Sequence, residues 1–340
     1  MSTILRVIVL ITSTILLTEG NTFAQFSEVF YKTPYANDFE LSNLRIPSYD
    51  IHTAGPNRDG IPAIDDPEFL NAEEANFLSD DAPILGLYHE GIAKAYPLQI
   101  IAYHEVVNDE FDGKPVAVTY STLCNSGIAY TASLNGEDTE FGISGLIYNS
   151  NTLLYDRKTE SLWSQILGQA VAGPASGKQL DKLATFQTTW GEWKAEHPGT
   201  LVLSTNTGYE RNYTQSPKTY YEPDERLLFP VKLTNNMLPL REKVIGLELD
   251  GQFKAYPLSF IRNNKAGKVQ DYFAGLDIEI NYNHQAKAAY ITDKNGEVIP
   301  AYTMYWYAWY AFHPETSIFL LNDGQLMQHL LAGELVWRAD

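Results

Sequence analysis

The chain has 340 residues, of which 42 are acidic and 24 basic, so its formal net charge is −18. A content of 44% apolar and 13% aromatic residues is too hydrophobic for an intrinsically disordered protein, and a single cysteine excludes a disulfide scaffold. The negative charge disfavours nucleic acid as a partner, because phosphate binding relies on lysine and arginine. A globular protein with one large domain or two smaller ones remains.

The first 24 residues have the pattern of a signal peptide. Arg6 precedes an apolar run at residues 7–17, and small residues up to Ala24 suit cleavage by signal peptidase. The run is too short to span a bilayer, and no later segment reaches the roughly 18 apolar residues that a span needs. We therefore expect cleavage and export of an acidic protein to the periplasm or the extracellular space, with an uncleaved anchor as the alternative.

The rest of the chain contains an internal repeat. Residues 84–101 align without gaps on residues 244–261 with nine of eighteen positions identical, where average composition would give roughly one. A further shared block, Trp-x-x-Trp-x-x-x-His-Pro-x-Thr, begins at Trp190 and again at Trp306. We interpret the chain as a tandem duplication in which residues shared by both copies serve the fold. His197 and His313, within the shared block, are accordingly expected to be structural.

Each copy is predicted to be mainly β. Apolar or alternating runs flank turn dipeptides such as Glu90-Gly91 and Asp112-Gly113, which is typical of hairpins, and the tryptophan blocks predict short helices that end before His-Pro. The expected fold class is α+β and β-rich, with two related lobes and a large insert in the first. The predicted boundaries are a signal peptide at 1–24, an N-terminal arm at 25–83, a first repeat at 84–205 with an insert at about 129–189, a connector at 206–242 and a second, degenerate repeat at 243–340.

Differences between the copies indicate that the first one bears the site. His104-Glu105 aligns with Asn264-Lys265, and Cys124 aligns with Ala286. Antiparallel pairing around Asp112-Gly113 would bring His104 and Cys124 to the same open end of a hairpin. We expect Cys124, His104 and Glu105 to carry any chemistry. The residues expected to bind a ligand are Ser126, Ser144, Tyr148, Asn149, Asn151, Arg157 and Trp163.

Several blocks of the chain resemble a known family. They are His-Glu-x-Val-Asn-Asp at 104–109, Tyr-Ser-Thr-Leu-Cys-Asn-Ser-Gly at 120–127, Ser-Gly-Leu-Ile-Tyr-Asn-Ser-Asn at 144–151 and Tyr-Asp-Arg-Lys-Thr-Glu-Ser-Leu-Trp-Ser-Gln at 155–165. These blocks closely resemble the uncharacterised domain-of-unknown-function family 3179, over nearly all of residues 50–320. The resemblance implies no activity. The family's usual pattern resembles Tyr-Cys-Pro-Leu-Cys-Gly-Ser-Gly, so Ser121 stands in place of one cysteine and a dithiol cycle is excluded here.

Three functional hypotheses remain for Cys124 and His104, so whether the protein is an enzyme stays open. A thiolate and an imidazole suit copper or zinc, with Glu105 as a further ligand or as a group that orients the histidine. Alternatively, Cys124 is a nucleophile whose proton His104 accepts. The third hypothesis is a binding module without chemistry, whose aromatic and asparagine side chains hold a sugar, a peptide or another small molecule. In the plainest case Cys124 is a small buried apolar residue.

Overall fold

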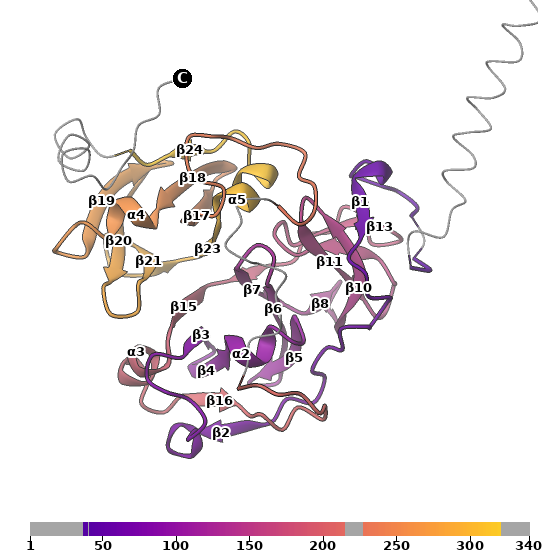
Figure 1. Ribbon diagram of the computed structural model, residues 1–340, viewed down its shortest axis with the longest axis horizontal. Helices are drawn as coiled ribbons and strands as arrows, with labels where there is room; N and C mark the ends of the chain where they lie inside the picture. Colours follow the sequence, from indigo (N-terminus) through magenta and orange to yellow (C-terminus); the bar gives the residue numbers. More distant parts are fainter. Residues whose placement is uncertain (1–36, 40, 215–226, 321–340) are drawn as a thin grey trace, which may run out of the picture.

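The computed structural model describes residues 37–39, 41–214 and 227–320, so the predicted signal peptide lies outside the described residues (Figure 1). The described part consists mainly of strands with a few short helices, which confirms the predicted β-rich character. Its five larger sheets form a five-bladed propeller, an arrangement that the sequence analysis did not predict. Within these ranges, no helix is long and apolar enough to cross a membrane.

Two blades come from the first sequence repeat, and each is named here by its central strands. In spatial order, the β3–β4 blade contains β15 (Thr185–Thr189), β3 (Pro83–His89), β4 (Ile92–Pro97), β16 (Leu201–Leu203) and β2 (Phe69–Asn71). The β5–β7 blade contains β14 (Lys182–Leu183), β7 (Ser126–Thr131), β6 (Lys114–Ser121) and β5 (Val106–Phe111).

Two further blades come from the second repeat. The β17–β18 blade contains β23 (Ala301–Tyr305), β17 (Lys243–Leu249), β18 (Gln252–Pro257) and β24 (Ser317–Ile318). The β19–β21 blade contains β19 (Lys268–Phe273), β20 (Leu276–Asn283), β21 (Ala288–Asp293) and β22 (Val298–Ile299).

The fifth blade, called the β10–β13 blade, lies within the segment expected to be an insert, together with one strand from the N-terminal arm. It contains β1 (Ile51–Thr53), β10 (Phe141–Tyr148), β11 (Asn151–Asp156), β12 (Leu162–Ser164) and β13 (Gln169–Ala172). A small hairpin of β8 (Ser133–Leu134) and β9 (Glu137–Asp138) precedes it.

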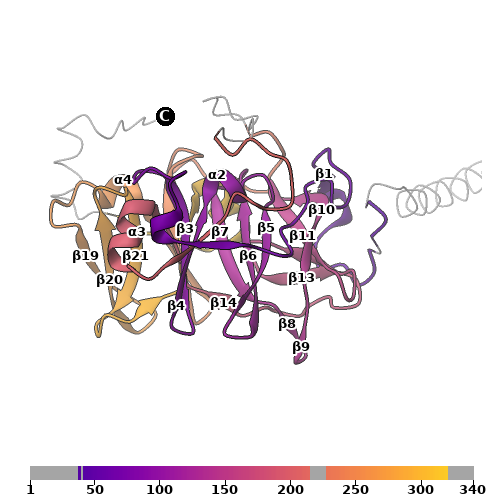
Figure 2. The same cartoon turned by 90° about the horizontal axis from the view of Figure 1, so that it is seen from below.

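Short helices follow strands at matching places in the two repeats. They are α2 (Leu98–Ile101), α3 (Trp190–Glu196), α4 (Leu258–Ile261) and α5 (Trp306–Phe312), with 3-10 turns at Ser48–Asp50 and Ala72–Glu74. Seen from the side, α2 and α4 lie at one edge of the blades, whereas the β8–β9 hairpin lies at the opposite edge (Figure 2).

The β3–β4 and β17–β18 blades have the same strand order and the same register. Gly86 pairs with Ala95 just as Gly246 pairs with Ala255, and in each blade a third strand pairs antiparallel with the first strand of the hairpin. A short fourth strand then pairs parallel with the second strand of the hairpin. The two sequence repeats therefore build blades of one topology.

The shared tryptophan blocks are structural in both repeats. A Cβ on Gly86 would lie 2.5 Å from the Trp193 ring, so only glycine admits that ring, and Gly246 relates to Trp309 in the same way. The indole of Trp309 donates to Thr316 at 2.8 Å, and the ring centroid of His313 lies 4.3 Å from that of Trp309. His313 is buried, and burial lowers its pKa to about 3, so it packs as a neutral ring.

An ion pair, buried in the first repeat and partly exposed in the second, joins neighbouring blades within each repeat. Lys94 binds Asp109 at 2.8 Å, and the Tyr96 hydroxyl donates to the same carboxylate. In the second repeat, Lys254 and Tyr256 contact Asp271 in the same manner, at 2.5 and 2.9 Å. Because buried charges need partners, these contacts hold one hairpin against the next.

Candidate functional site

Glu105 and Cys124 lie at the blade edge that carries α2. Strand β5 begins directly after α2, and Val106 pairs with Thr119 near the end of β6. The β6–β7 turn that contains Cys124 is therefore at the same edge, because antiparallel strands bring the start of one beside the end of the other. The hairpin geometry places these two predicted residues together.

The Cys124 turn is held by residues of the second repeat. The backbone N–H of Tyr305 donates to the Cys124 carbonyl at 2.9 Å, and the Tyr307 hydroxyl donates to the Leu123 carbonyl at 2.6 Å. Tyr305 ends β23 and Tyr307 lies in α5. The turn thus joins the β5–β7 blade to the β17–β18 blade.

The Cys124 thiol is fully buried among polar groups. It donates to the Ser150 carbonyl at 3.2 Å and accepts from the Asn151 amide at 3.6 Å, while the Tyr307 hydroxyl lies 3.7 Å away. Burial raises the pKa of the thiol to about 12, and this outweighs the opposing effect of the neighbouring donors. The thiol is therefore protonated at neutral pH.

Glu105 adopts a backbone conformation that is unusual for its residue type. Its φ is +59°, in the left-handed region, where a residue with a side chain is about 1 kcal/mol less favourable than glycine. It caps α2, because its N–H donates to the Ile101 carbonyl at 2.7 Å, and its own carbonyl accepts from the Tyr120 N–H at 2.9 Å.

The Glu105 carboxyl is buried and has a single side-chain partner within the described residues. The Thr152 hydroxyl donates to it at 2.8 Å. Burial raises the pKa of this carboxyl to about 7, since one hydroxyl does not replace the water that a carboxylate loses. Thr152 belongs to β11, so the contact links the β5–β7 blade to the β10–β13 blade.

The second repeat has glycine at the position structurally equivalent to Glu105. Gly267 has φ +67°, and its carbonyl accepts from the Tyr282 N–H just as that of Glu105 accepts from Tyr120. A Cβ on Gly267 would lie 2.6 Å from the Tyr282 carbonyl oxygen. The gap-free alignment paired Glu105 with Lys265, and the structure corrects this pairing. The first repeat thus carries a strained glutamate where the fold favours glycine.

An amide and hydroxyl network lies beneath the thiol. The side-chain oxygen of Gln165 accepts from the Asn151 side-chain amide at 2.8 Å and from the Ser126 hydroxyl at 2.9 Å. The side-chain NH₂ of Gln165 donates to the Thr119 hydroxyl at 3.0 Å. All four side chains are buried. Their mutual bonds fix the orientation of Asn151 toward the sulfur.

Two buried hydroxyls beside the thiol have no hydrogen-bond partner within the described residues. They belong to Ser121, which is 0% exposed, and Ser150, which is 1% exposed. Ser121 lies close enough to the thiol to oppose the rise of its pKa, but its hydroxyl makes no hydrogen bond of ordinary geometry. An unsatisfied buried hydroxyl costs on the order of 1–3 kcal/mol, so these groups are suited to meet a bound molecule.

Left-handed backbone conformations surround Cys124. Besides Glu105, they occur at Asn125, at Asn149 and at Ser150, with φ between 50° and 59°. Asparagine tolerates this conformation, whereas glutamate and serine do not favour it. Asn149 and Ser150 form the two-residue turn between β10 and β11, which requires positive φ, and Lys287 is left-handed at the position in the second repeat that matches Asn125. Glu105 is therefore the position where the two repeats differ, since its counterpart is glycine.

The outer side of this cluster is formed by residues that keep slight exposure. Glu105 and Tyr120 are each 7% exposed, and Tyr305 is half-buried. Burial raises the pKa of Tyr120, and the Tyr305, Glu105 and Cys124 side chains raise it further. We call the set of Glu105, Tyr120, Ser121, Cys124, Ser150, Asn151 and Tyr305 the Glu105–Cys124 centre.

His104 does not face this centre. Its ring is fully buried, with Nδ1 2.8 Å from the Pro62 carbonyl oxygen and Nε2 2.6 Å from the Tyr213 hydroxyl. Burial lowers its pKa. Because both ring nitrogens are engaged, His104 has no free nitrogen for a metal or for the thiol proton. Within the described ranges, no three His, Cys, Asp or Glu side chains are grouped as a metal site would require.

The other predicted binding residues divide into two groups. Ser126 and Asn151 belong to the network below the thiol, and Asn149 lies in the adjacent turn, where it donates to the Ala311 carbonyl. The remaining residues lie elsewhere: Ser144 bonds the Leu153 carbonyl, Tyr148 packs on Phe312, Arg157 pairs with Asp65 and Glu140, and Trp163 donates to Asp156 in the core.

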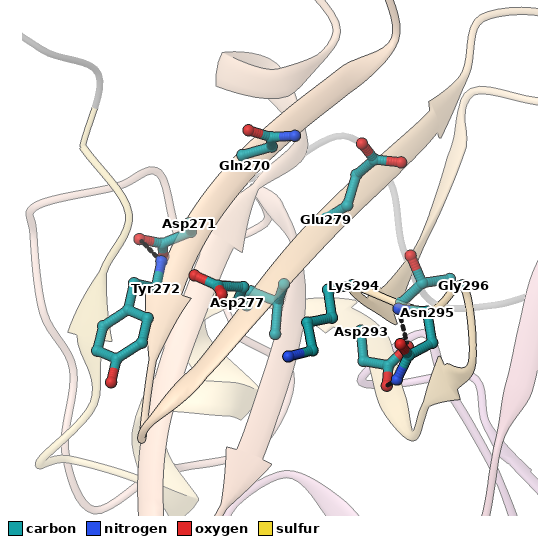
Figure 3. Close-up of a pocket in the computed structure, with 11 residues that line it drawn as sticks. Gln270, Asp271, Tyr272, Asp277, Glu279, Asp293, Lys294, Asn295 and Gly296 are labelled. Atoms are coloured by element: carbon teal, nitrogen blue, oxygen red, sulfur yellow. Dashed lines mark hydrogen bonds between the residues drawn. The ribbon is translucent and has the colours of Figure 1, made fainter.

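Two acidic grooves lie at equivalent places in the two repeats. One, of about 860 Å³, is lined by Asp65, Asp109, Glu140 and Arg157 among others. The other, of about 660 Å³, contains Asp271, Asp277, Glu279 and Asp293, which Figure 3 shows around Lys294. Asp109 and Asp271 are in ion pairs, and Asp293 accepts backbone N–H groups of its own turn. Asp65, Glu140 and Glu279 also have basic partners, so most carboxylates of the two grooves are already partnered within the chain.

A comparison with protein-family models identifies the relatives of the chain. The model described as "Protein of unknown function (DUF3179)" matches residues 58–316, which is most of the chain. The chain belongs to this family. No curated protein and no solved structure matches it. The DUF3179 region includes all residues of the Glu105–Cys124 centre, so the resemblance predicted from the sequence blocks is confirmed.

Tyr120, Ser121, Ser150 and Tyr305 of this centre, and Tyr307 beside it, were not predicted from the sequence. Tyr305 and Tyr307 come from the repeat that was expected to be a degenerate copy. Their counterparts beside Trp190 are Thr189 and Gly191. A search for residues found only in the second repeat, as well as for those found only in the first, would have drawn attention to these tyrosines.

Proposed function

We propose that the protein is an exported binding module whose Glu105–Cys124 centre holds a small polar ligand, a sugar or a peptide segment, without chemistry at the thiol. The observation that carries this proposal is Glu105 in a left-handed conformation where the second repeat has Gly267. A side chain that costs stability, and that acts electrostatically on a buried thiol with an unpartnered hydroxyl beside it, is best explained by a ligand. Export rests on the N-terminal signal pattern.

Proton energetics favour binding over a reactive thiol. The pKa of Cys124 is about 12 and that of Glu105 about 7. Moving the proton from the thiol to the carboxylate therefore costs about 7 kcal/mol, at about 1.4 kcal/mol for each pKa unit. His104 offers no alternative base because Pro62 and Tyr213 engage its ring nitrogens. A protonated thiol remains useful as a hydrogen-bonding group.

We also infer that a tandem duplication produced four of the five blades. The equal strand order and register of the β3–β4 and β17–β18 blades support this inference, as do the matched glycine–tryptophan contacts and the matched ion pairs. On this interpretation the β10–β13 blade is an insertion into the first copy. It supplies Ser150, Asn151 and Thr152, and it thereby makes the two copies functionally different.

The proposal is tested on the purified full chain by elemental analysis, thiol titration and ligand-induced thermal stabilisation. We expect no stoichiometric metal, and we expect Cys124 to react with a thiol reagent at pH 8 only after denaturation, with or without a chelator. Members of a panel of oligosaccharides and short peptides should raise the melting temperature of the wild type but not of Glu105→Gln.

Two results would overturn the binding-module proposal. Copper or zinc that is present at one equivalent and lost in Cys124→Ala would restore the metal hypothesis. Rapid modification of the native thiol would restore the reactive-thiol hypothesis. Glu110→Gln is the matched control, because Glu110 is an exposed glutamate of the same blade and should respond to ligands like the wild type.

A further inference from the structure

Within the described residues, the Glu105 carboxyl has neither a lysine partner, as Asp109 and Asp271 have, nor several hydrogen-bond donors, as Asp156 has. Asp109 is paired with Lys94, and Asp271 with Lys254. Asp156 accepts from the backbone and hydroxyl of Thr159 and from the Trp163 indole. Glu105 has the Thr152 hydroxyl alone among the described residues. A buried carboxyl in this situation is suited to a ligand that supplies the missing charge.

The Glu105–Cys124 centre offers hydroxyl oxygens that can accept hydrogen bonds. The Ser121 and Ser150 hydroxyls are unpartnered. The Tyr120 hydroxyl donates to the Asn125 side-chain oxygen at 3.1 Å, which leaves its lone pairs available. The Tyr305 phenol acts electrostatically on Tyr120. Each of these hydroxyls can accept a hydrogen bond from an N–H group of a ligand as well as donate one.

We propose that the Glu105–Cys124 centre binds a primary ammonium group, carried by the amino terminus of a peptide or by a small amine. This inference rests on the proposed binding function and names its ligand. A primary ammonium has three N–H donors and one positive charge, which match a carboxylate surrounded by hydroxyl oxygens. The net charge of −18 attracts cations to the protein at long range.

A neutral ligand would fit the centre less well. A sugar hydroxyl can bond Ser121 or Ser150, but it leaves the Glu105 carboxylate buried without a counter-charge. An ammonium group removes that deficit, and in doing so it favours the ionised form of Glu105. Binding and deprotonation of the carboxyl are therefore coupled.

This coupling predicts the pH dependence of binding. The pKa of Glu105 is about 7 in the free protein, raised by burial. The carboxylate that the ammonium needs is populated about tenfold more at pH 8 than at pH 6. Affinity should therefore rise about tenfold over this range for a small alkyl amine that stays protonated, and about three- to fivefold for a peptide amino terminus, whose own pKa of about 7.7–8.0 leaves it partly neutral at pH 8. The groups that act on the carboxyl or are acted on by it are Thr152, which does not titrate, and Tyr120 and Cys124, which stay protonated throughout. The Arg241 guanidinium acts electrostatically on Tyr305, at the outer side of the centre.

The test is isothermal titration calorimetry of the full chain with matched charged and neutral probes. The ammonium probes are glycylglycinamide, which represents a peptide amino terminus, and ethanolamine, which represents a small amine. Their neutral counterparts are N-acetylglycinamide and ethylene glycol. We expect at least one ammonium probe to bind, with affinity higher at pH 8 than at pH 6 by about tenfold for ethanolamine or by about three- to fivefold for glycylglycinamide. Glu105→Gln should bind the ammonium probe at least tenfold more weakly and without pH dependence. Glu110→Gln should keep the affinity and the pH dependence of the wild type.

The outcomes separate this inference from the proposed function. If neutral probes or sugars bind in a Glu105-dependent way and the ammonium probes do not, the binding module stands and the ammonium assignment is overturned. If ammonium binds equally to the wild type and to Glu105→Gln, the assignment is also overturned. If no probe, sugar or peptide binds to the folded wild type, both proposals fail.

Discussion

At the scale of single residues, the molecule accepts a stability cost at Glu105. The backbone lies in the left-handed region, and the buried carboxyl has one hydrogen-bond donor. Asp109, equally buried, has a lysine and a tyrosine as partners. The contrast indicates that Glu105 is not retained for stability, because the same fold provides a better solution at Gly267.

Ionisation of Glu105 should weaken the fold as the pH rises. The pKa of this carboxyl is about 7 in the folded protein and 4.5 when unperturbed. The contribution of the protonated carboxyl to folding stability is therefore fully present below pH 4.5 and is lost as the pH rises through 7. The loss amounts to about 3 kcal/mol. Urea unfolding at pH 5, 6.5 and 8 should therefore show Glu105→Gln gaining stability relative to the wild type with rising pH. A constant difference would mean that Glu105 ionises as easily in the folded protein as in the unfolded chain.

At the scale of elements, a glycine and a tryptophan define each repeat. Alanine at Gly86 would place its Cβ 2.5 Å from the Trp193 ring, in a blade with no room to shift it. Such overpacking costs about 1–3 kcal/mol. Urea unfolding should therefore show that Gly86→Ala lowers the free energy of unfolding by this amount, and Gly246→Ala should have the same effect.

Gly199→Ala is the matched control, because nothing lies within 4 Å of the added Cβ. It should change the free energy of unfolding by less than about 0.5 kcal/mol. Equal stability of Gly86→Ala and the control would contradict this packing account.

Local patterns in the sequence predicted these elements well. The hairpins, the short helices and the structural role of His313 all depend on neighbouring residues and on period, which a sequence displays. The same reasoning predicted that His104 and Cys124 would meet at the open end of their hairpin, whereas the structure brings the neighbouring Glu105 to Cys124. His104 was misplaced, since the left-handed conformation at Glu105 reverses the chain and directs the two adjacent side chains to different surroundings.

At the scale of the whole molecule, the centre depends on contacts between distant parts of the chain. The first repeat supplies Glu105 and Cys124, the β10–β13 blade supplies Ser150 to Thr152, and the second repeat supplies Tyr305 and Tyr307. Assembly into a propeller creates these contacts. Pattern analysis treats each repeat separately, so it predicted neither the five-bladed arrangement nor the contribution of the second repeat.

The central claim is that Glu105 serves a ligand at the expense of stability, and Glu105→Gly tests it most directly. This change introduces the residue that the second repeat has at Gly267. At pH 8, where the wild-type carboxyl is ionised, calorimetric unfolding should give Glu105→Gly a melting temperature at or above that of the wild type. The stabilisation by any ligand found for the wild type should disappear. Glu90→Gly, which relieves a left-handed residue in an exposed turn, should keep the ligand response. A Glu105→Gly protein that melts well below the wild type, or that responds to ligand unchanged, would contradict the account.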